Sequence, residues 1–427
     1  MNIINNIKKP IYNYLNQIKK FNKNIRLLLF ASMLSFVAFG IYNVNFNLYI
    51  LSLGIEPDGL GNILSAAPFA TMFASIPIGF LAEKLGFRKV FVFIYSVSGL
   101  ALLFQVATPN IVIITGSALL LGIASSGNFV VRLPFLSANI ADSERTTVFS
   151  VNSVVDGITF AIGAILGGYL PNLFQSLGLD LSIAYRYTLF FSGAMNLIAV
   201  IPVFLIADHS HLTNRKISLA PYLWGFDRFM VKSAIIEFLL GLMHGLIVPF
   251  INVFFLFYLS TSREYYSWVE AFIFVPVVIA TLIGPFLAQR IGNVRVTMAS
   301  RFIVPLCLVA FSISASPWIG TGAYLGYRGL FSMGQSLWFA FAMTTASRKS
   351  KAALSSWLQI SFQIGVVLSA QITGHLLANA NYRMPFIISA GSALLAGILT
   401  WVFIRPYDKR PEKNPLPRTV AGDMLEM

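Results

Sequence analysis

The sequence predicts an all-α membrane protein with twelve transmembrane helices in two pseudo-symmetric six-helix bundles. Of its 427 residues, 57% are hydrophobic and only 11% are charged, against about a quarter charged in ordinary soluble domains. Apolar runs of about 20 residues, the length that crosses a bilayer, recur between short polar breaks. Short motifs of the first half also return in the second half. We therefore expect the lipid bilayer to be the main partner of this apolar surface.

Twelve spans follow from the apolar runs. In the first half, 27–206, they lie near 27–50, 59–82, 90–108, 111–140, 147–170 and 187–206. In the second half, 231–404, they lie near 231–259, 267–288, 296–314, 319–346, 352–376 and 384–404. The remaining segments are polar and are predicted to be cytoplasmic: 1–26, 207–230 and 405–427. Several runs exceed the minimum length, so we expect tilted helices or helices that extend past the bilayer.

The positive charges indicate the orientation. The chain has 30 Lys and Arg and a net charge of +14, and 24 of these cations fall in the two tails and the even-numbered loops. The six exceptions are Arg132, Arg301 and Arg328 inside spans and Arg186, Arg263 and Arg383 at the other face. Because cytoplasmic loops are rich in Lys and Arg, both termini are predicted to be cytoplasmic. Such alternation is not the single basic patch of a nucleic-acid-binding protein.

Several other classes of protein are excluded. Cys307 is the only cysteine and lies in an apolar run, which excludes disulfides within the chain and thiolate metal sites. We identify no cleavable signal peptide, because the start of the chain is polar and the first apolar run is long enough to span. The sequence has neither a Gly-x-x-x-x-Gly-Lys-Ser/Thr phosphate loop nor a His-Glu-x-x-His pattern. We therefore expect neither an enzyme nor a cofactor or metal site.

The two halves carry matching motifs at a constant offset. Leu-Ala-Glu-Lys-Leu-Gly at 81–86 returns as Leu-Ala-Gln-Arg-Ile-Gly at 287–292. The same offset aligns Gly-Ala-Ile-Leu-Gly-Gly at 163–168 with Ser-Ala-Gln-Ile-Thr-Gly at 369–374. Duplicated six-helix halves are typical of transporters whose site lies at the interface between the halves.

The segment Gly-Phe-Leu-Ala-Glu-Lys-Leu-Gly-Phe-Arg-Lys at 79–89 resembles the signature of the major facilitator superfamily between helices 2 and 3. The family usually has Asp where this chain has Glu83. The resemblance implies the major facilitator fold, with this loop latching the cytoplasmic faces of the two halves. The gating residues would be Gly79, Glu83, Gly86, Arg88 and Lys89. The alternative is a basic loop that only determines topology.

Helix 5 carries a second, partial resemblance. Gly163, Gly167 and Gly168 belong to a segment that is similar to the antiporter signature of drug and metabolite exporters. Ala164 replaces the Pro that normally follows the first Gly. The resemblance implies an exporter of the drug or metabolite:proton antiporter type. The alternative is a seam of small residues for tight helix packing.

Two ionisable residues lie deep in the first half. Arg132 lies about nine residues before the cytoplasmic end of helix 4, and Asp156 lies about nine residues after the start of helix 5, so both are about 13 Å deep. An ion pair between them is geometrically plausible. The pair is either structural, or Asp156 is a proton-titrating carboxylate whose ionisation depends on Arg132 and on substrate.

Helix 7 carries a polar stripe. Glu237, Gly241, His244, Val248 and Asn252 fall on one face at helical spacing. Glu237 and His244 are candidates for carrying protons along a water-filled path. The alternatives are an interfacial Glu237 that reaches toward the headgroups and an uncharged, packed His244.

Other polar residues inside spans are candidates for lining a substrate cavity. Arg328 and Gln335 lie seven residues apart on one face of helix 10, and an Arg at this depth is costly to expose to lipid. The further candidates are Asn43, Asn47, Asn252, Gln359 and Gln363. The alternative role for these amides is to join neighbouring helices by hydrogen bonds.

Together these features predict a secondary active transporter that works by alternating access, with a small-molecule substrate and protons as partners. We expect efflux of a small amphipathic compound or metabolite. One alternative is a proton-coupled importer, or symporter, or a facilitator of a polar metabolite; another is a transporter-like receptor or assembly partner without flux. We expect a monomeric multi-pass protein of the plasma membrane, the inner membrane of a prokaryote.

Overall fold

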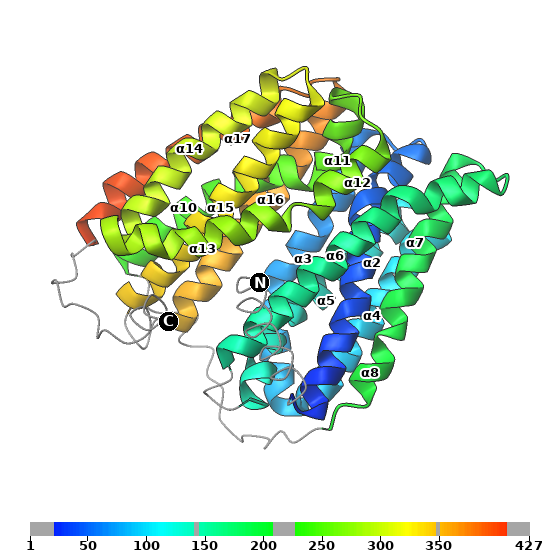
Figure 1. Cartoon of the computed structure of the whole chain (residues 1–427), viewed down its shortest axis with the longest axis horizontal. Helices are drawn as coiled ribbons and strands as arrows, with labels where there is room; N and C mark the ends of the chain where they lie inside the picture. The colour runs from blue at the N-terminus through cyan, green and yellow to red at the C-terminus, as the bar shows by residue number, and fades with distance from the viewer. Residues whose placement is uncertain (1–20, 141–144, 208–226, 347–350, 408–427) are drawn as a thin grey trace, which may run out of the picture.

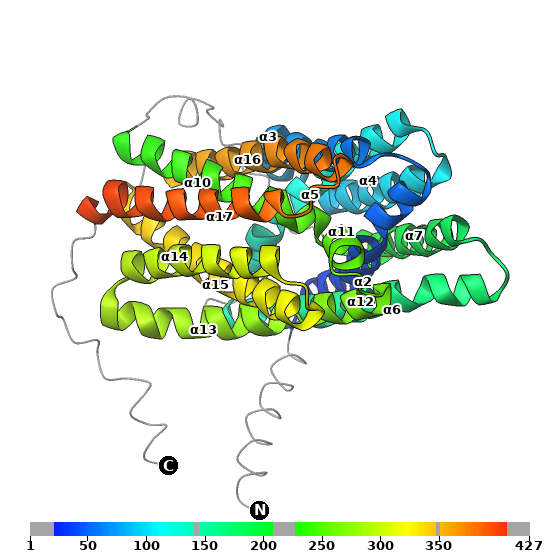
Figure 2. The same ribbon diagram turned by 90° about the horizontal axis from the view of Figure 1, so that it is seen from above.

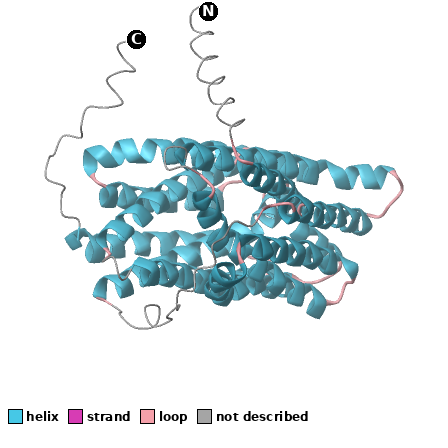
Figure 3. Cartoon of the chain, turned by 90° about the horizontal axis from the view of Figure 1, so that it is seen from below, coloured by secondary structure: helices cyan, strands magenta, loops and turns pink. Residues whose placement is uncertain are grey.

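The computed structural model describes residues 21–140, 145–207, 227–346 and 351–407, and all regular structure in them is helical (Figure 3). The first half contains α2 (Lys23–Ser52), α3 (Pro57–Leu85), α4 (Phe87–Ala107), α5 (Ile111–Ala138), α6 (Arg145–Ser176), α7 (Leu181–Ile198) and α8 (Val200–Phe204). The second half contains α10 (Arg228–Ile247), α11 (Ile251–Val253), α12 (Arg263–Ala271), α13 (Phe274–Ile291), α14 (Asn293–Ile313), α15 (Pro317–Thr345), α16 (Lys351–Ala378) and α17 (Met384–Leu399). The predicted all-α architecture is confirmed.

Eleven helical segments among the described residues are long and apolar enough to cross a membrane. They coincide with the predicted spans except for the tenth, which is α15. This helix has 29 residues and is therefore long enough to span. Its polar face, with Arg328 and Gln335, lowers its hydropathy, as is typical of a helix that faces protein rather than lipid.

Several helices begin before the apolar runs that predict them, because polar residues cap them. Asn22 accepts a hydrogen bond from the backbone N–H of Ile25 at 2.8 Å. Asp227 likewise accepts one from the N–H of Met230 at 2.7 Å. Such caps satisfy backbone donors that the helix itself leaves unpaired, so a helix extends into polar sequence.

The seventh span is not one continuous α-helix. α10 ends at Ile247, and the 3₁₀ turn η2 (Val248–Phe250), α11 and the π-helix η3 (Phe254–Tyr258) complete the span. Pro249 lies in the turn and has no N–H to donate to an α-helical hydrogen bond. The predicted span near 231–259 is confirmed as Arg228–Tyr258, with this break in its α-helical hydrogen bonding. The twelfth span ends similarly, in the π-helix η4 (Thr400–Ile404) and the 3₁₀ helix η5 (Arg405–Tyr407).

The two halves repeat each other's packing. α2 packs on α6 in the first half as α10 packs on α16 in the second. Gly86 joins α3 to α4 with φ of +88°, and Gly292 joins α13 to α14 with φ of +92°. Both turns need a conformation that residues with a Cβ rarely adopt. The repeat found in the sequence at 81–86 and 287–292 therefore corresponds to a repeated structure.

The described halves contact each other mainly toward one end. We call the end where α2 begins and α17 ends the terminal side, and the opposite end the far side. α3 packs on α16, and α6 packs on α12, along two edges of the molecule (Figure 2). The bundles diverge toward the terminal side (Figure 1).

The apolar core follows the same division. One buried cluster contains the far-side part of the first half, including Tyr49 and Leu60, together with most of the second half. The terminal-side part of the first half, including Phe91 and Phe135, forms a separate cluster. Apolar packing therefore joins the halves on the far side.

Candidate functional site

The structure brings Arg132 and Asp156 together inside the first half. The Arg132 guanidinium of α5 donates to the Asp156 carboxylate of α6 across 2.8 Å. Asn152, one turn before Asp156, accepts from Arg132 at 2.5 Å and donates to Asp156 at 3.1 Å. Both charged residues are buried. Each charge is thus compensated, as a buried ion pair requires; a part in proton coupling stays a prediction.

A second buried cluster lies inside the second half, around Glu237. This residue of α10 has 0% exposure, which contradicts a carboxylate that reaches toward the headgroups. Its two oxygens accept from Gln335 of α15 at 3.0 and 3.1 Å. The positive charge of Arg301 on α14 acts on it as well. Arg301 also donates to the hydroxyl of Thr400. The alternative of an interfacial Glu237 is therefore wrong, because neighbouring helices cover the carboxylate, whereas its part in proton coupling stays a prediction.

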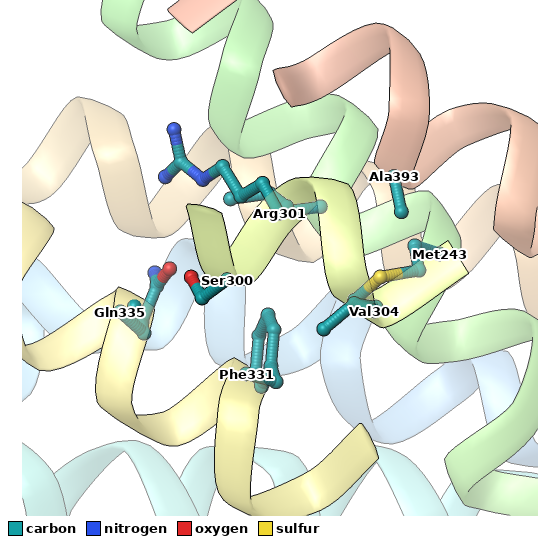
Figure 4. Close-up of a pocket in the computed structure, with 9 residues that line it drawn as sticks. Met243, Ser300, Arg301, Val304, Phe331, Gln335 and Ala393 are labelled. Carbon is teal, nitrogen blue, oxygen red and sulfur yellow. The ribbon is translucent and has the colours of Figure 1, made fainter. Parts of the chain in front are cut away.

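A small cavity adjoins this cluster (Figure 4). Arg301 and Gln335 contribute to its lining, together with Ser300, Val304 and Phe331. Its volume of about 10 Å³ is close to the minimum that holds one water molecule. The cavity is too small for a solute.

A third cluster lies where the halves meet and includes a residue that the sequence analysis missed. Glu270 of α12 is 3% exposed. It accepts from Asn43 of α2, in the other half, at 2.8 Å and from the hydroxyl of Tyr324 at 3.4 Å. Arg328 donates to the same hydroxyl at 3.2 Å. A buried carboxylate and a guanidinium therefore share one tyrosine beside the interface.

His244 continues this cluster toward the terminal side. Its Nδ1 lies 3.3 Å from the hydroxyl of Tyr327. Its ring lies 5.5 Å from that of Phe331 and 5.6 Å from that of Phe362. His244, Phe331 and Arg328 are all partly exposed. Aromatic and cationic groups thus share one partly accessible surface of α10, α15 and α16.

Besides Asn43, two of the predicted cavity residues join the halves, and these two line no open space in this conformation. Asn47 donates to the side chain of Asn252 at 2.8 Å and to the carbonyl of Pro249 at 2.6 Å. Asn252 donates to the carbonyl of Val44 at 3.2 Å. Both asparagines are buried. Contact with a solute in another conformation stays a prediction, as it does for Gln359 and Gln363, which are partly exposed on α16.

The glycines of α6 form a packing seam. A Cβ on Gly163 would lie 2.1 Å from the backbone oxygen of Val37 on α2, and one on Gly167 would lie 3.1 Å from Ile41 Cα. A Cβ on Gly168 would lie 2.3 Å from Ser267 Oγ on α12, in the other half. Close helix packing therefore accounts for all three glycines; an exporter role for them is untested.

The residues of the predicted latch make contacts within the first half. Gly79 faces Val130 of α5, with 3.2 Å from a Cβ to its side chain. The guanidinium of Arg88 lies 4.7 Å from the ring centroid of Phe204 on α8. Lys89 is exposed. The side chain of Glu83 lies outside the described part, so its pairing stays a prediction.

Two repeated halves that pack on each other and enclose buried charged groups define a polytopic membrane protein with the architecture that is typical of secondary transporters. The particular family follows from comparison with known sequences. The chain belongs to the major facilitator superfamily, whose family model matches residues 28–224 and 233–423. The resemblance found in the loop at 79–89 is thereby confirmed, and with it the predicted fold.

Similar proteins are known individually. The MFS-type transporter YfkF of Bacillus subtilis, itself uncharacterised, is 28% identical over 141 residues, which cover 32% of this chain and 35% of YfkF. The quinolone resistance protein NorA of Staphylococcus aureus is 25% identical over 192 residues, which cover 44% of this chain and 46% of NorA. The chain thus matches less than half the length of either relative. The solved nucleoside transporter NupG, as its D323A mutant, has a TM-score of 0.76 at 16% identity, covering 89% of this chain and 99% of NupG.

Proposed function

We propose that this protein is a proton-coupled secondary transporter that exports a small amphipathic compound by alternating access. One observation carries the proposal: Glu270, a buried carboxylate of the second half, accepts a hydrogen bond from Asn43 of the first half at 2.8 Å. Protonation would weaken that bond, because a neutral carboxyl is a poorer acceptor than a carboxylate. Protonation of the Glu270 carboxylate and separation of the two halves are therefore linked.

The other buried ionisable groups fit into this scheme as a proposal. Asp156 with Arg132, Glu237 and His244 are each held by partners on neighbouring helices. Ionisable groups inside a membrane protein commonly form proton relays. We assign them to proton binding within the bundles, with Glu270 at the interface between the bundles.

Export is favoured over import by the relatives. NorA is named for resistance to quinolones, and removal of a drug from the cell is one route to resistance. Import of a polar metabolite is the second candidate, favoured by Arg328 and by the amides of Gln359 and Gln363 at partly exposed positions. The direction of coupling distinguishes the two.

The cellular setting is also proposed. The cation-rich terminal side faces the cytoplasm, in keeping with the distribution of Lys and Arg. The structure then has its far side closed and its halves apart toward the cytoplasm. The protein works as a monomer in the plasma membrane, with segments 27–206 and 231–404 as its two moving bodies.

Proteoliposomes with an imposed pH gradient test the proposal. We expect a quinolone or another amphipathic solute to accumulate when the lumen is acidic, which is the sign of proton antiport. Accumulation only with an alkaline lumen would indicate symport and reject export. Absence of flux for all solutes, with or without a gradient, would favour a receptor or assembly role. Glu270→Gln, which keeps the acceptor for Asn43, should retain exchange and lose the response to the gradient.

A further inference from the structure

We propose that Arg328 binds the anionic group of the transported solute, so that the substrates are amphipathic organic anions. The inference rests on the proposed transport function and adds the class of substrate. It starts from a charge that the protein itself compensates only in part.

Arg328 differs in its partners from Arg132 of α5 and from Arg263 at the start of α12, and in its exposure from Arg301, which is buried. Arg132 lies 2.8 Å from Asp156, and Arg263 lies 3.7 Å from Glu264. Among the residues that the structure describes, no carboxylate lies within 4.0 Å of Arg328. Its described hydrogen bond runs to a neutral acceptor, the hydroxyl of Tyr324. A guanidinium has five N–H donors in a planar fork that matches a carboxylate or phosphate, so it has donors to spare.

The position of Arg328 makes it accessible to a solute. The residue is partly exposed, whereas Tyr324 and Glu270 behind it are buried. Glu270 is therefore a poor site for a cationic solute: its oxygens already accept from Asn43 and Tyr324, and they have almost no contact with solvent. The group that a solute meets first carries positive charge.

Aromatic groups lie directly beside this charge. Phe331 follows Arg328 by three residues on α15, which places it on the same face about 4.5 Å further along the helix. Its ring lies 6.0 Å from that of Tyr327 and 5.5 Å from that of His244. Phe362 of α16 extends this surface. A ligand with an anionic head and an aromatic or aliphatic body therefore matches the charge and the apolar surface together.

A matched set of ligands tests the inference. 4-Phenylbutyrate, 4-phenylbutanol and 4-phenylbutylamine share one skeleton and differ in charge. Binding to the purified full-length protein in detergent is measured by thermal shift and by competition with labelled 4-phenylbutyrate. We expect the acid to bind at least about tenfold more tightly than the alcohol, and the amine to bind more weakly still.

Variants locate the effect. Arg328→Gln should abolish the preference for the acid, and Arg328→Lys should keep part of it, because the charge remains without the fork. Arg383→Gln removes an exposed arginine of the far side and should leave the preference unchanged. Phe331→Ala should weaken binding of the acid and of the alcohol to the same extent. This variant tests the apolar part of the site even if Arg328→Gln fails to fold.

Three results would overturn the inference: equal binding of acid and alcohol, tighter binding of the amine, or a preference for the acid that survives Arg328→Gln. Absence of binding by all three ligands up to about 10 mM would overturn it as well. Binding in detergent needs no flux and no gradient. If the acid binds specifically but is not transported, the proposed transport function is rejected and the anion site stands. If only uncharged solutes show proton-driven flux, the anion site is rejected and the transport function stands.

Discussion

At the scale of single residues, charges in this protein are held by few, specific contacts. Arg132, Asp156 and Asn152 form a closed triangle of hydrogen bonds between two neighbouring helices. Removing one member of a buried ion pair leaves the other without compensation, which costs more than replacing both. The triangle thus allows the structural and the functional roles of Asp156 to be separated.

A double-mutant cycle makes that separation. Asp156→Asn should lower the free energy of unfolding by about 3 kcal/mol, because it leaves Arg132 buried without a counter-charge. Adding Arg132→Gln should recover part of this loss, as measured by thermal unfolding in detergent. If the pair is only structural, the double mutant should still respond to a pH gradient; if Asp156 couples protons, it should retain exchange and lose gradient-driven flux. Strictly additive losses of stability would show that the two groups do not interact.

The contrast between Asp156 and Glu270 shows how far the partners and the burial of a carboxylate can be predicted from sequence. The pairing of Asp156 with Arg132 could be anticipated, because both lie at the same depth on consecutive helices. Glu270 lies four residues into the predicted span 267–288, where a carboxylate is expected to reach water. It is buried because α2 of the other half covers it, through Asn43. Its presence inside a predicted span was a signal, but the covering helix could not be inferred from local sequence.

At the scale of helices, hydropathy predicted the elements well and their interruptions poorly. The breaks at Pro249 and between α12 and α13 depend on backbone hydrogen bonding, which an apolar average does not register. The glycine seams were better signalled, because small residues at helical spacing permit close backbones. The seam between α2 and α6 is the clearest case.

Substitution of Gly163 measures what this seam contributes. In Gly163→Ala the new methyl group would lie 2.1 Å from the backbone oxygen of Val37, so the helices must move apart. We expect a loss of about 1–3 kcal/mol in thermal unfolding. Gly391 of α17 is the matched control, since a Cβ there meets nothing within 4 Å. Gly391→Ala should be neutral or stabilise by up to about 1 kcal/mol. Equal changes in stability for the two substitutions would show that the seam between α2 and α6 contributes nothing specific.

At the scale of the whole molecule, the far-side contact depends on backbones that approach closely. A Cβ on Gly61 of α3 would lie 2.7 Å from the oxygen of Ala370 and 3.0 Å from Gly374 Cα, both on α16. A side chain at this point would separate the halves on the far side. Substitutions at Gly61 or Gly374 are therefore expected to shift the equilibrium between conformations that are closed and open on the far side.

Gly61→Val should shift the protein toward a conformation that is open on the far side. The probe is a single cysteine at Asn47, 4% exposed in the closed seam, in a chain with Cys307 replaced by Ser. We expect labelling by a membrane-impermeant thiol reagent to rise at least about threefold with Gly61→Val. Gly116→Val, at a glycine with open space around it, should leave the labelling rate unchanged. An unchanged labelling rate with Gly61→Val would show that the contact of Gly61 with α16 does not control opening on the far side.

Orientation can be tested with the same reagent on intact cells. Lys89 on the terminal side and Arg383 on the far side are both exposed. A cysteine at Arg383 should be labelled from outside, and one at Lys89 only after permeabilisation, because the cation-rich side is expected to be cytoplasmic. The reverse pattern at both sites would invert the proposed topology.

The divergence of the two halves toward the terminal side makes their arrangement sensitive to ionic strength. Closing the terminal side would bring the ends of the halves together, and with them exposed cations such as Lys84 of α3 and Arg290 of α13. Like charges would then approach each other, and their repulsion reaches about 10 Å in 0.1 M salt but only about 3 Å in 1 M salt. Concentrated salt should therefore favour closure of the terminal side and raise the labelling of a cysteine at Asn47. The resting conformation of this protein would then be set partly by the electrolyte on its cation-rich side.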